Sequence, residues 1–389
     1  MRFILALFLV GSAYGFEIVG PMVQFHEHAA HKATVTWLTQ VGNNIPTFTT
    51  TNAQVRHTRN AEFGDLVYYI TQVHLDELPT GKRCDFQLAV GDIKRAYSFR
   101  VPPMDQPDNI SFVIGGDMGP GDQARSLLIE AKKLNPDFAV IGGDISYAHG
   151  NIGQAQPKVW VMWLNLWAET MTSEQGEITP LLVAIGNHEV DGGYRRSKEE
   201  AKYFYQLFHF PDNEAYYVAD IGDYLSFIML DTWHISHPKD QVEFLKGALI
   251  REKDVPYLIP VYHFPAYGIL KGGYDAWQAK TIRKYWTPLF EDSQVRVIFE
   301  NDHHIYKRSK PIYQDKVNKE KGIYYLGDGA WGRLRPLKKE QWESLWYVEN
   351  AAPLLHFMHV VITKEKPLSV KVIDPQGTVY ESIQIELKK

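Results

Sequence analysis

The sequence predicts an all-β sandwich over residues 16–101, followed by an α/β domain over residues 111–389. Residues 16–101 contain short segments of alternating apolar and polar residues and no helical periodicity of any length, a pattern typical of a β-sandwich. From about residue 111 onward, buried strands alternate with helices, which is typical of an α/β layer fold. Several of these strands run into a glycine turn and then Asp, Asn or His, where open α/β sheets bind their ligands.

Composition indicates a globular chain without an affinity for nucleic acid. The 389 residues are 45% hydrophobic and 13% aromatic, which is enough material for two domains. The net charge of -5 argues against non-specific nucleic-acid binding, because that binding needs a basic face.

The first fifteen residues are typical of a secretory signal peptide. One arginine precedes a short apolar run, and Ala13 and Gly15 supply the small residues of a cleavage site. The run is too short to cross a membrane, and no later apolar run is long enough for a span. We therefore expect the mature chain to begin near Phe16 and to be secreted or delivered to the lumen of an acidic organelle.

The expected secretion bears on the interpretation of two other residues, Cys84 and Asn109. Cys84 is the only cysteine, and a buried small hydrophobe is favoured over half of an intermolecular disulfide. Asn109 begins an Asn-Ile-Ser sequon, so we expect a glycan there. The sequence leaves the oligomeric state open.

Residues 34–39, 66–71 and 97–101 are the clearest strands of the first domain. Together with the step at residues 75–81, they resemble a fibronectin type III module. His26, His28 and His31 are interpreted as solvated loop histidines, with a metal site as the alternative. Residues 102–110 are rich in proline and predict a stiff linker.

The second domain repeats one unit several times: an apolar strand, a glycine turn and then Asp, Asn or His. A strand ending at Asp117 is followed by a helix over residues 123–133, and the next strand covers residues 138–144. Trp160, Trp163, Leu164 and Trp167 recur at helical spacing and predict a core-facing helix. We expect all these strands to deliver their polar residues to one edge of a sheet: Asp117, Asp144 with Tyr147, Asn187 with His188, His263, and 302–304.

These side chains favour a pair of metal ions. Clustered carboxylates cannot all stay ionised without cations, and a carboxylate beside a phenol suits a hard ion such as Fe(III). Two ions that share one carboxylate hold a nucleophilic hydroxide and clamp both oxygens of a phosphoryl displacement. Asn187 offers a neutral oxygen, and His188 is a proton donor beside the metals.

Five segments together resemble the motifs of the metallophosphoesterases, or calcineurin-like phosphoesterases. They are Gly116-Asp-Met-Gly119, Gly143-Asp-Ile-Ser-Tyr147, Gly186-Asn-His-Glu189, Tyr262-His-Phe-Pro265 and 299–308. The tyrosine of the second motif narrows the resemblance to the purple acid phosphatases, whose larger members also have a fibronectin-like domain. It implies two central β-sheets flanked by helices.

The resemblance implies a residue for each role in phosphate-monoester hydrolysis by metal-bound hydroxide. Asp117, Tyr147 and His304 would bind Fe(III), with Asp144 bridging. Asn187 and His263 would bind a divalent Zn, Mn or Fe ion. His188 would be the catalytic histidine that protonates the leaving group of a small phosphorylated substrate.

The sequence departs from the family at two places. Asp302 stands where the last motif has a histidine for the second metal. Asp302 replaces that ligand and shifts the preference towards harder ions, or His303 turns inward, or the second site is weakened. The loop after His263 also lacks the family's further histidines, which leaves Lys271 as its one cation. Lys271 and His149 are therefore candidate substrate contacts, with a solvated lysine as the alternative.

Three classes of function follow from the sequence. A secreted acid phosphatase is the leading interpretation. A phosphodiesterase or nucleotide pyrophosphatase would use the same two metals. A weakly active or non-catalytic binding protein is the third class, because Asp302 replaces a metal-ligand histidine.

Overall fold

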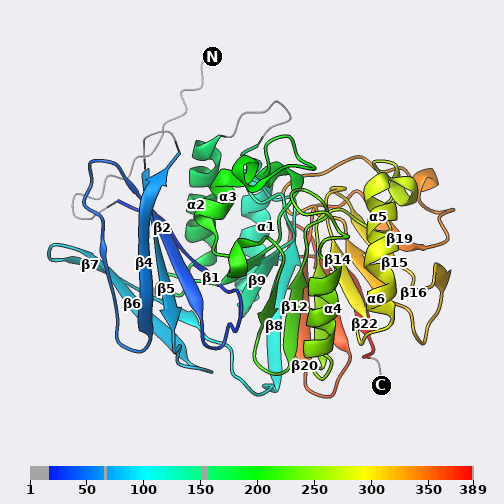
Figure 1. Ribbon diagram of the computed structural model, residues 1–389, viewed down its shortest axis with the longest axis horizontal. Coiled ribbons are helices and arrows are strands. Elements are labelled where there is room, and N and C mark those ends of the chain that lie inside the picture. Colours follow the sequence, from blue (N-terminus) through cyan, green and yellow to red (C-terminus); the bar gives the residue numbers. More distant parts are fainter. Residues whose placement is uncertain (1–16, 65–67, 150–155, 388–389) are drawn as a thin grey trace, which may run out of the picture.

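The computed structural model describes residues 17–64, 68–149 and 156–387. The predicted signal peptide and residues 66–67 of one predicted strand lie outside these ranges. Within them, ten strands form one sheet and seven form a second, with helices beside both sheets (Figure 1). This is the α/β arrangement with two central sheets that the family resemblance implied.

The larger sheet has a parallel centre. Its strands β8, β9 and β10 pair in parallel, because helices α1 (Asp122–Lys133) and α2 (Pro157–Met171) return the chain between them. In spatial order its strands are β22 (Val379–Ile385), β21 (Leu368–Ile373), β20 (Phe357–Thr363), β8 (Asn109–Gly115), β9 (Phe138–Ile141), β10 (Leu181–Val183), β1 (Val19–Gln24), β2 (Ala33–Gln40), β5 (Tyr68–Asp76) and β4 (Gln54–Phe63).

The smaller sheet repeats this plan. Strands β12, β13, β14 and β18 are parallel, and helices α4 (Val242–Arg251), α5 (Trp277–Tyr285) and α6 (Thr287–Glu291) connect the first three. Its order is β11 (Tyr217–Asp220), β12 (Leu225–Met229), β13 (Tyr257–Val261), β14 (Val297–Glu300), β18 (Tyr324–Gly327), β15 (Tyr306–Ser309) and β19 (Val348–Ala352). Shorter elements are α3 (Lys202–Leu207), β16 (Ile312–Tyr313), β17 (Lys316–Val317) and the 3-10 helices η1 (Asn187–Glu189), η2 (Lys198–Ala201), η3 (Pro211–Asn213), η4 (Gly273–Asp275) and η5 (Lys339–Gln341).

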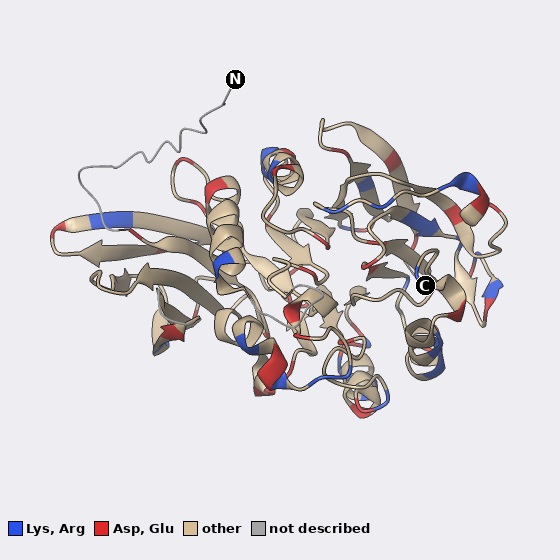
Figure 2. Ribbon diagram, turned by 90° about the horizontal axis from the view of Figure 1, so that it is seen from above, with Lys and Arg blue, Asp and Glu red and all other residues tan. Residues whose placement is uncertain are grey.

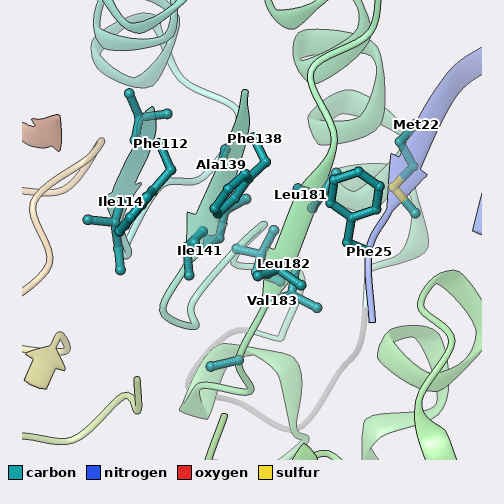
Figure 3. Packing of buried hydrophobic residues seen from close by; sticks show 14 of the residues in the cluster. Met22, Phe25, Phe112, Ile114, Phe138, Ala139, Ile141, Leu181, Leu182 and Val183 are labelled. Atoms are coloured by element: carbon teal, nitrogen blue, oxygen red, sulfur yellow. The ribbon is translucent and has the colours of Figure 1, made fainter. Parts of the chain in front are cut away.

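The two sheets pack face to face through aromatic side chains. The ring of Phe227 on β12 lies edge-on to Phe112 at 5.2 Å and to Phe138 at 5.8 Å. Ile228, the next residue, belongs instead to the cluster that contains Leu245 of α4, because successive strand residues point to opposite faces. Figure 3 shows Phe112, Phe138 and Leu181 side by side across the larger sheet. The smaller sheet is therefore buried on both faces, as expected for parallel strands.

The N-terminal region is a two-layer β structure, as predicted. Strands β3 (Thr47–Thr50), β6 (Arg83–Val90) and β7 (Ile93–Arg100) form a separate sheet. Its Phe48 ring stacks on Trp37 of β2 at 6.3 Å and on Phe86 at 5.1 Å. Cys84 is buried in this region, as predicted, and burial raises the pKa of its thiol to about 12. The specific likeness to a fibronectin type III module stays a prediction.

The sandwich and the α/β region share one sheet. Strand β1 pairs in parallel with β10 at Gln24 and Leu181, so β4, β5, β2 and β1 continue the larger sheet (Figure 1). Strand β8 begins at Asn109, inside the predicted linker 102–110. The predicted domain boundaries did not anticipate this continuity, because it depends on one long-range pairing.

The interpretation of His26 as a solvated loop residue is wrong. His26 is only 4% exposed, and its ring lies 4.8 Å from that of His209, which lies 4.5 Å from that of His74. Thr34 Oγ1 lies between His26 Nε2 and His74 Nδ1, at 3.2 and 3.0 Å. These histidines line a cavity of about 360 Å³, whereas His31 is exposed.

We expect this cluster to make the protein sensitive to acid. Burial, followed by the neighbouring His209, His57, Arg59 and Arg56, lowers the pKa of His74 to about 4. An unfolded histidine titrates near ~6.5, so between about pH 6.5 and 4 the unfolded chain binds a proton that the folded protein does not. The free energy of unfolding should therefore fall as the pH drops through this range.

Thermal unfolding of a His74→Gln variant from pH 7 to pH 4 measures this contribution. The loss of melting temperature towards acid should be smaller in the variant than in the wild type, whatever their difference at pH 7. His31→Gln, at an exposed position, is the control. Parallel curves for wild type and His74→Gln would contradict the prediction.

Candidate metal centre

The side chains that the sequence singled out come together, at the carboxyl ends of strands from both sheets. Asp117, Asp144 and Asn187 follow β8, β9 and β10, whereas His263 and Asp302 follow β13 and β14. The expectation of a single sheet edge needs correction, because two packed sheets present their strand ends to one point. A hydrogen bond from the Asp302 N–H to Asp117 Oδ2, at 2.8 Å, joins the two sets.

The glycine turns allow the strand ends to approach this closely. A Cβ atom on Gly142 would overlap the side-chain amide of Asn301, which donates to the Tyr262 carbonyl at 3.1 Å. Asp117 and Asp144 themselves have φ values of 60° and 51°, a left-handed conformation that Asp tolerates better than most residues.

Asp117, Tyr147 and His304 form one half of the centre. The Tyr147 hydroxyl donates to Asp117 Oδ1 at 3.0 Å and lies 2.9 Å from His304 Nε2. His304 Nε2 is also 2.9 Å from Asp117 Oδ1. Burial and the Asp117 carboxylate raise the pKa of Tyr147 well above its usual value. The guanidinium of Arg333 stacks on the Tyr147 ring at 4.4 Å.

Asp144, His263 and Asp302 form the other half. His263 Nε2 lies 3.2 Å from Asp144 Oδ1 and 3.5 Å from Asp302 Oδ1. The other ring nitrogen, Nδ1, lies 2.9 Å from the Gly142 carbonyl, to which it must donate because a carbonyl only accepts. This bond orients the ring so that Nε2 faces the two carboxylates.

The charges of this half depend on one another. Burial lowers the pKa of His263, but Asp144 and Asp117 outweigh it and hold the pKa well above its usual value. Burial likewise raises the pKa of Asp302, but the neighbouring His263 and the charge of Lys271 outweigh it and hold that pKa well below its usual range. The carboxylates are thus anionic and attract positive charge.

Asn187 and His188 begin η1 beside Asp144. The His188 N–H donates to Asp144 Oδ1 at 2.7 Å, and the ring Nδ1 lies 2.5 Å from the His149 carbonyl. His188 Nε2 is 3.9 Å from Asp144 Oδ2. Asn187, His188 and His149 line a cavity of about 200 Å³ together with Tyr194. The predicted catalytic histidine and the predicted pocket residue His149 therefore share one cavity.

The last motif places Asp302 in the centre, and His303 Nε2 lies 3.8 Å from Asp302 Oδ2. His303 Nδ1 lies 3.4 Å from Asp328 Oδ2, and its ring packs against Phe264. The Asp302 carboxylate faces His263, and its replacement of the family's second-metal histidine stays a prediction. Lys271, predicted either to meet phosphate or to be solvated, donates from Nζ to Asp302 Oδ1 at 2.7 Å. Lys271 therefore forms an ion pair with a residue of the candidate centre.

The buried donors fit positive ions. Asp144 Oδ2, Asp302 Oδ2 and His263 Nε2 are buried without a hydrogen bond among the described residues. Asp117, Asp144 and His263 each offer an atom within 4.8 Å of the others. Buried, unpaired carboxylate oxygens are costly unless a cation compensates them. The donor set of carboxylate, phenol and imidazole suits iron, zinc or manganese.

Sequence reasoning missed two supports of the centre. Glu189 is fully buried and accepts backbone N–H bonds from Asp144, Ile145 and Gly186 at 2.7, 2.8 and 2.8 Å. Tyr194 donates to Asn187 Oδ1 at 3.4 Å and packs on His234. Glu189 could have been found from the sequence, because it is a charged residue directly after Asn187 and His188. No local pattern indicated a role for Tyr194.

Comparison with known proteins identifies the family of this chain. The model of the calcineurin-like phosphoesterase family matches residues 88–306, and the chain belongs to this family.

The relatives that it resembles are purple acid phosphatases. Purple acid phosphatase 21 of Arabidopsis thaliana is 30% identical over 245 residues, which are 60% of this chain and 52% of the relative. The Fe(3+)-Zn(2+) purple acid phosphatase 12 of the same plant is 22% identical over 317 residues, or 76% of this chain and 66% of the relative. The chain spans about half the length of the first two curated relatives that it matches.

A solved structure shares the fold. The purple acid phosphatase from yellow lupin (Lupinus luteus) seeds superposes with a TM-score of 0.73 at 19% identity, over 95% of this chain and 74% of the lupin chain.

We expect a methyl group at Gly329 to disturb the centre. Gly329 has a φ of 60°, and a Cβ atom there would overlap the Asp117 carboxylate. Gly329→Ala should lower metal affinity about 10–100-fold, as changes beside metal ligands do, and stability by about 1–2 kcal/mol. Elemental analysis and thermal unfolding measure the two effects. Gly121→Ala, where a Cβ meets no atom within 4 Å, is the control, and equal metal content in both variants would contradict the prediction.

Proposed function

We propose that this protein is a metal-dependent phosphatase of the purple acid phosphatase type, which hydrolyses phosphate monoesters. The observation that supports this most strongly is the contact of Tyr147 with both Asp117 and His304. A half-buried phenol between a carboxylate and an imidazole is a donor set for a ferric ion. The relatives named purple acid phosphatases, one of them with Fe(3+) and Zn(2+), support the same assignment.

The proposed centre has two metal positions. Asp117, Tyr147 and His304 would hold Fe(III), and Asn187, His263 and Asp302 would hold a divalent zinc, manganese or iron ion, with Asp144 between them. When bound, the two ions would polarise the phosphate and activate water. The buried Asp144, Asp302 and His263 exclude bulk water from that side of the centre.

His188 is the proposed proton donor for the leaving oxygen. Its Nδ1 is engaged with the His149 carbonyl at 2.5 Å, so Nε2 is the nitrogen free to take up and release a proton. The ring packs 4.3 Å from that of Tyr147, which places it between the two halves of the centre. His149 lines the same cavity and is a proposed substrate contact.

The cellular setting is also part of the proposal. The predicted signal peptide implies secretion or an acidic lumen, and Asn109 is exposed at the start of β8, where a glycan would fit. Among the described residues, no helix combines the length and apolarity needed to cross a membrane. Lys and Arg residues are interspersed with Asp and Glu in the view of Figure 2, which supports a small phosphorylated substrate over nucleic acid.

Metal removal should abolish activity before it unfolds the protein. Catalytic ions keep open coordination positions, and the two sheets are held by aromatic packing away from the metals. We expect a chelator to stop hydrolysis of a chromogenic monoester while the circular dichroism spectrum is retained, and metal addition to restore turnover. Parallel assays on a diester test the alternative of a phosphodiesterase. A protein that hydrolyses neither ester with any metal would instead be a binding protein.

His188→Asn should slow the reaction about 10²–10⁴-fold, the usual contribution of a general acid. The loss should be larger for an alkyl phosphate than for a nitrophenyl phosphate, because the nitrophenolate leaves without a proton. Turnover numbers for both esters, with metal content measured in each preparation, check this. An equal loss on both esters would refute the proton-donor role, and His31→Asn, at an exposed position, is the control.

A further inference from the structure

The second metal position already contains a positive charge supplied by the chain. Lys271 lies in the loop between β13 and η4, and its Nζ donates to Asp302 Oδ1 at 2.7 Å. The Asp302 side chain is fully buried, and the lysine side chain is 33% exposed. The lysine therefore reaches inward from the surface and delivers its ammonium group to a buried carboxylate.

The oxygen that Lys271 binds is one that faces the other donors of this position. Asp302 Oδ1 is 3.5 Å from His263 Nε2, which is 3.2 Å from Asp144 Oδ1. A divalent ion bound by these atoms would have to share Asp302 with the ammonium group or displace it. The ammonium group and the ion would repel each other on this carboxylate, so the pairing with Lys271 weakens the hold of Asp302 on the ion.

The position of the proposed ferric ion has no such competitor. Among the described residues, no lysine or arginine forms an ion pair with Asp117 or Asp144, whereas Asp302 pairs with Lys271. Arg333, the cation beside this half, stacks on the face of the Tyr147 ring. The two halves of the centre therefore differ in how much uncompensated negative charge they offer to a metal.

A buried lysine elsewhere in the fold, Lys307, pairs with other carboxylates. Lys307 is fully buried and bridges Glu300 and Asp328 at 2.5 and 2.8 Å. These carboxylates belong to β14 and to the segment after β18, and the Lys307 ammonium forms no ion pair with Asp302. Among the described residues, Lys271 is thus the one lysine or arginine that forms an ion pair with the carboxylate of a proposed ligand of the second ion. The Arg335 guanidinium reaches only the Asp302 backbone carbonyl, at 3.5 Å.

We propose that Lys271 is a built-in competitor of the second metal ion: its ammonium group occupies Asp302, so that the protein binds one metal ion tightly and the second weakly. This inference rests on the proposed function, because it assumes that the centre binds metal. It also explains what changes when Asp302 stands in place of the family's histidine: the position can then bind the Lys271 ammonium group. A carboxylate holds an ammonium group by charge, and a neutral imidazole does not.

Metal counting on the full-length protein tests this without an activity assay. The metal-free protein is titrated with Zn²⁺ and, separately, Mn²⁺ against a competing chelator, and the ions bound per chain are measured by elemental analysis. Lys271→Met keeps the length of the side chain and removes its charge. We expect the second ion to bind at least about tenfold more tightly to this variant than to the wild type, within the range known for residues beside metal ligands.

Two controls separate charge from general disturbance. Lys271→Arg retains the positive charge and should bind the second ion as weakly as the wild type. Lys280→Met removes a lysine from an exposed pair with Asp275 at 3.0 Å and should change nothing. Should Lys271→Met fold poorly, the double variant Lys271→Met with Asp302→His replaces both members of the pair and is expected to bind two ions.

The outcomes distinguish this inference from the proposed function. A wild type that binds two ions with equal affinity, or a Lys271→Met variant whose second site is no tighter, overturns the competition and leaves the phosphatase proposal intact. A wild type that binds no ion at all overturns both. One tight ion in the wild type, with a second gained in Lys271→Met and not in Lys271→Arg, supports the inference.

Discussion

The central constraint on this structure is a cluster of carboxylates that are buried from water. Asp117, Asp144 and Asp302 are all buried, and their mutual repulsion opposes folding unless positive charge or hydrogen bonds compensate it. The protein supplies part of this compensation itself. Backbone N–H groups bind Asp117 and Asp144, and Lys271 neutralises Asp302. The oxygens that remain unpaired give the site its attraction for metal ions.

Two sheets in face-to-face contact make this concentration of charge possible. Aromatic packing between β8, β9 and β12 fixes their relative position. The loop after β14 can therefore donate a hydrogen bond to the loop after β8, from the Asp302 N–H to Asp117 Oδ2 at 2.8 Å. Glu189 then ties the turns after β9 and β10 together through three backbone N–H groups. The proposed metal ligands are thus mounted on rigid strand ends and on turns that bond to each other.

The strand-to-turn units could be predicted because their signals are local. A short apolar run, glycine and then Asp, Asn or His occurs within about ten residues, and periodicity alone places the side chain at the strand's carboxyl end. The same reasoning located helix α2, whose Trp160, Trp163 and Trp167 are buried. Local patterns could not show that the predicted strand ends belong to two sheets, or that His26 is buried beside His74 and His209.

The sequence by itself therefore determined the kind of chemistry: which residue types end the strands, and that they suit a metallophosphoesterase. Tertiary structure alone decided which charges compensate which. Lys271 and Asp302 are 31 residues apart in the chain, and Asp302 and Asp117 are 185 apart. Sequence patterns describe what one segment prefers, whereas an ion pair depends on where two distant segments are held, and that position is set by the packing of the whole core.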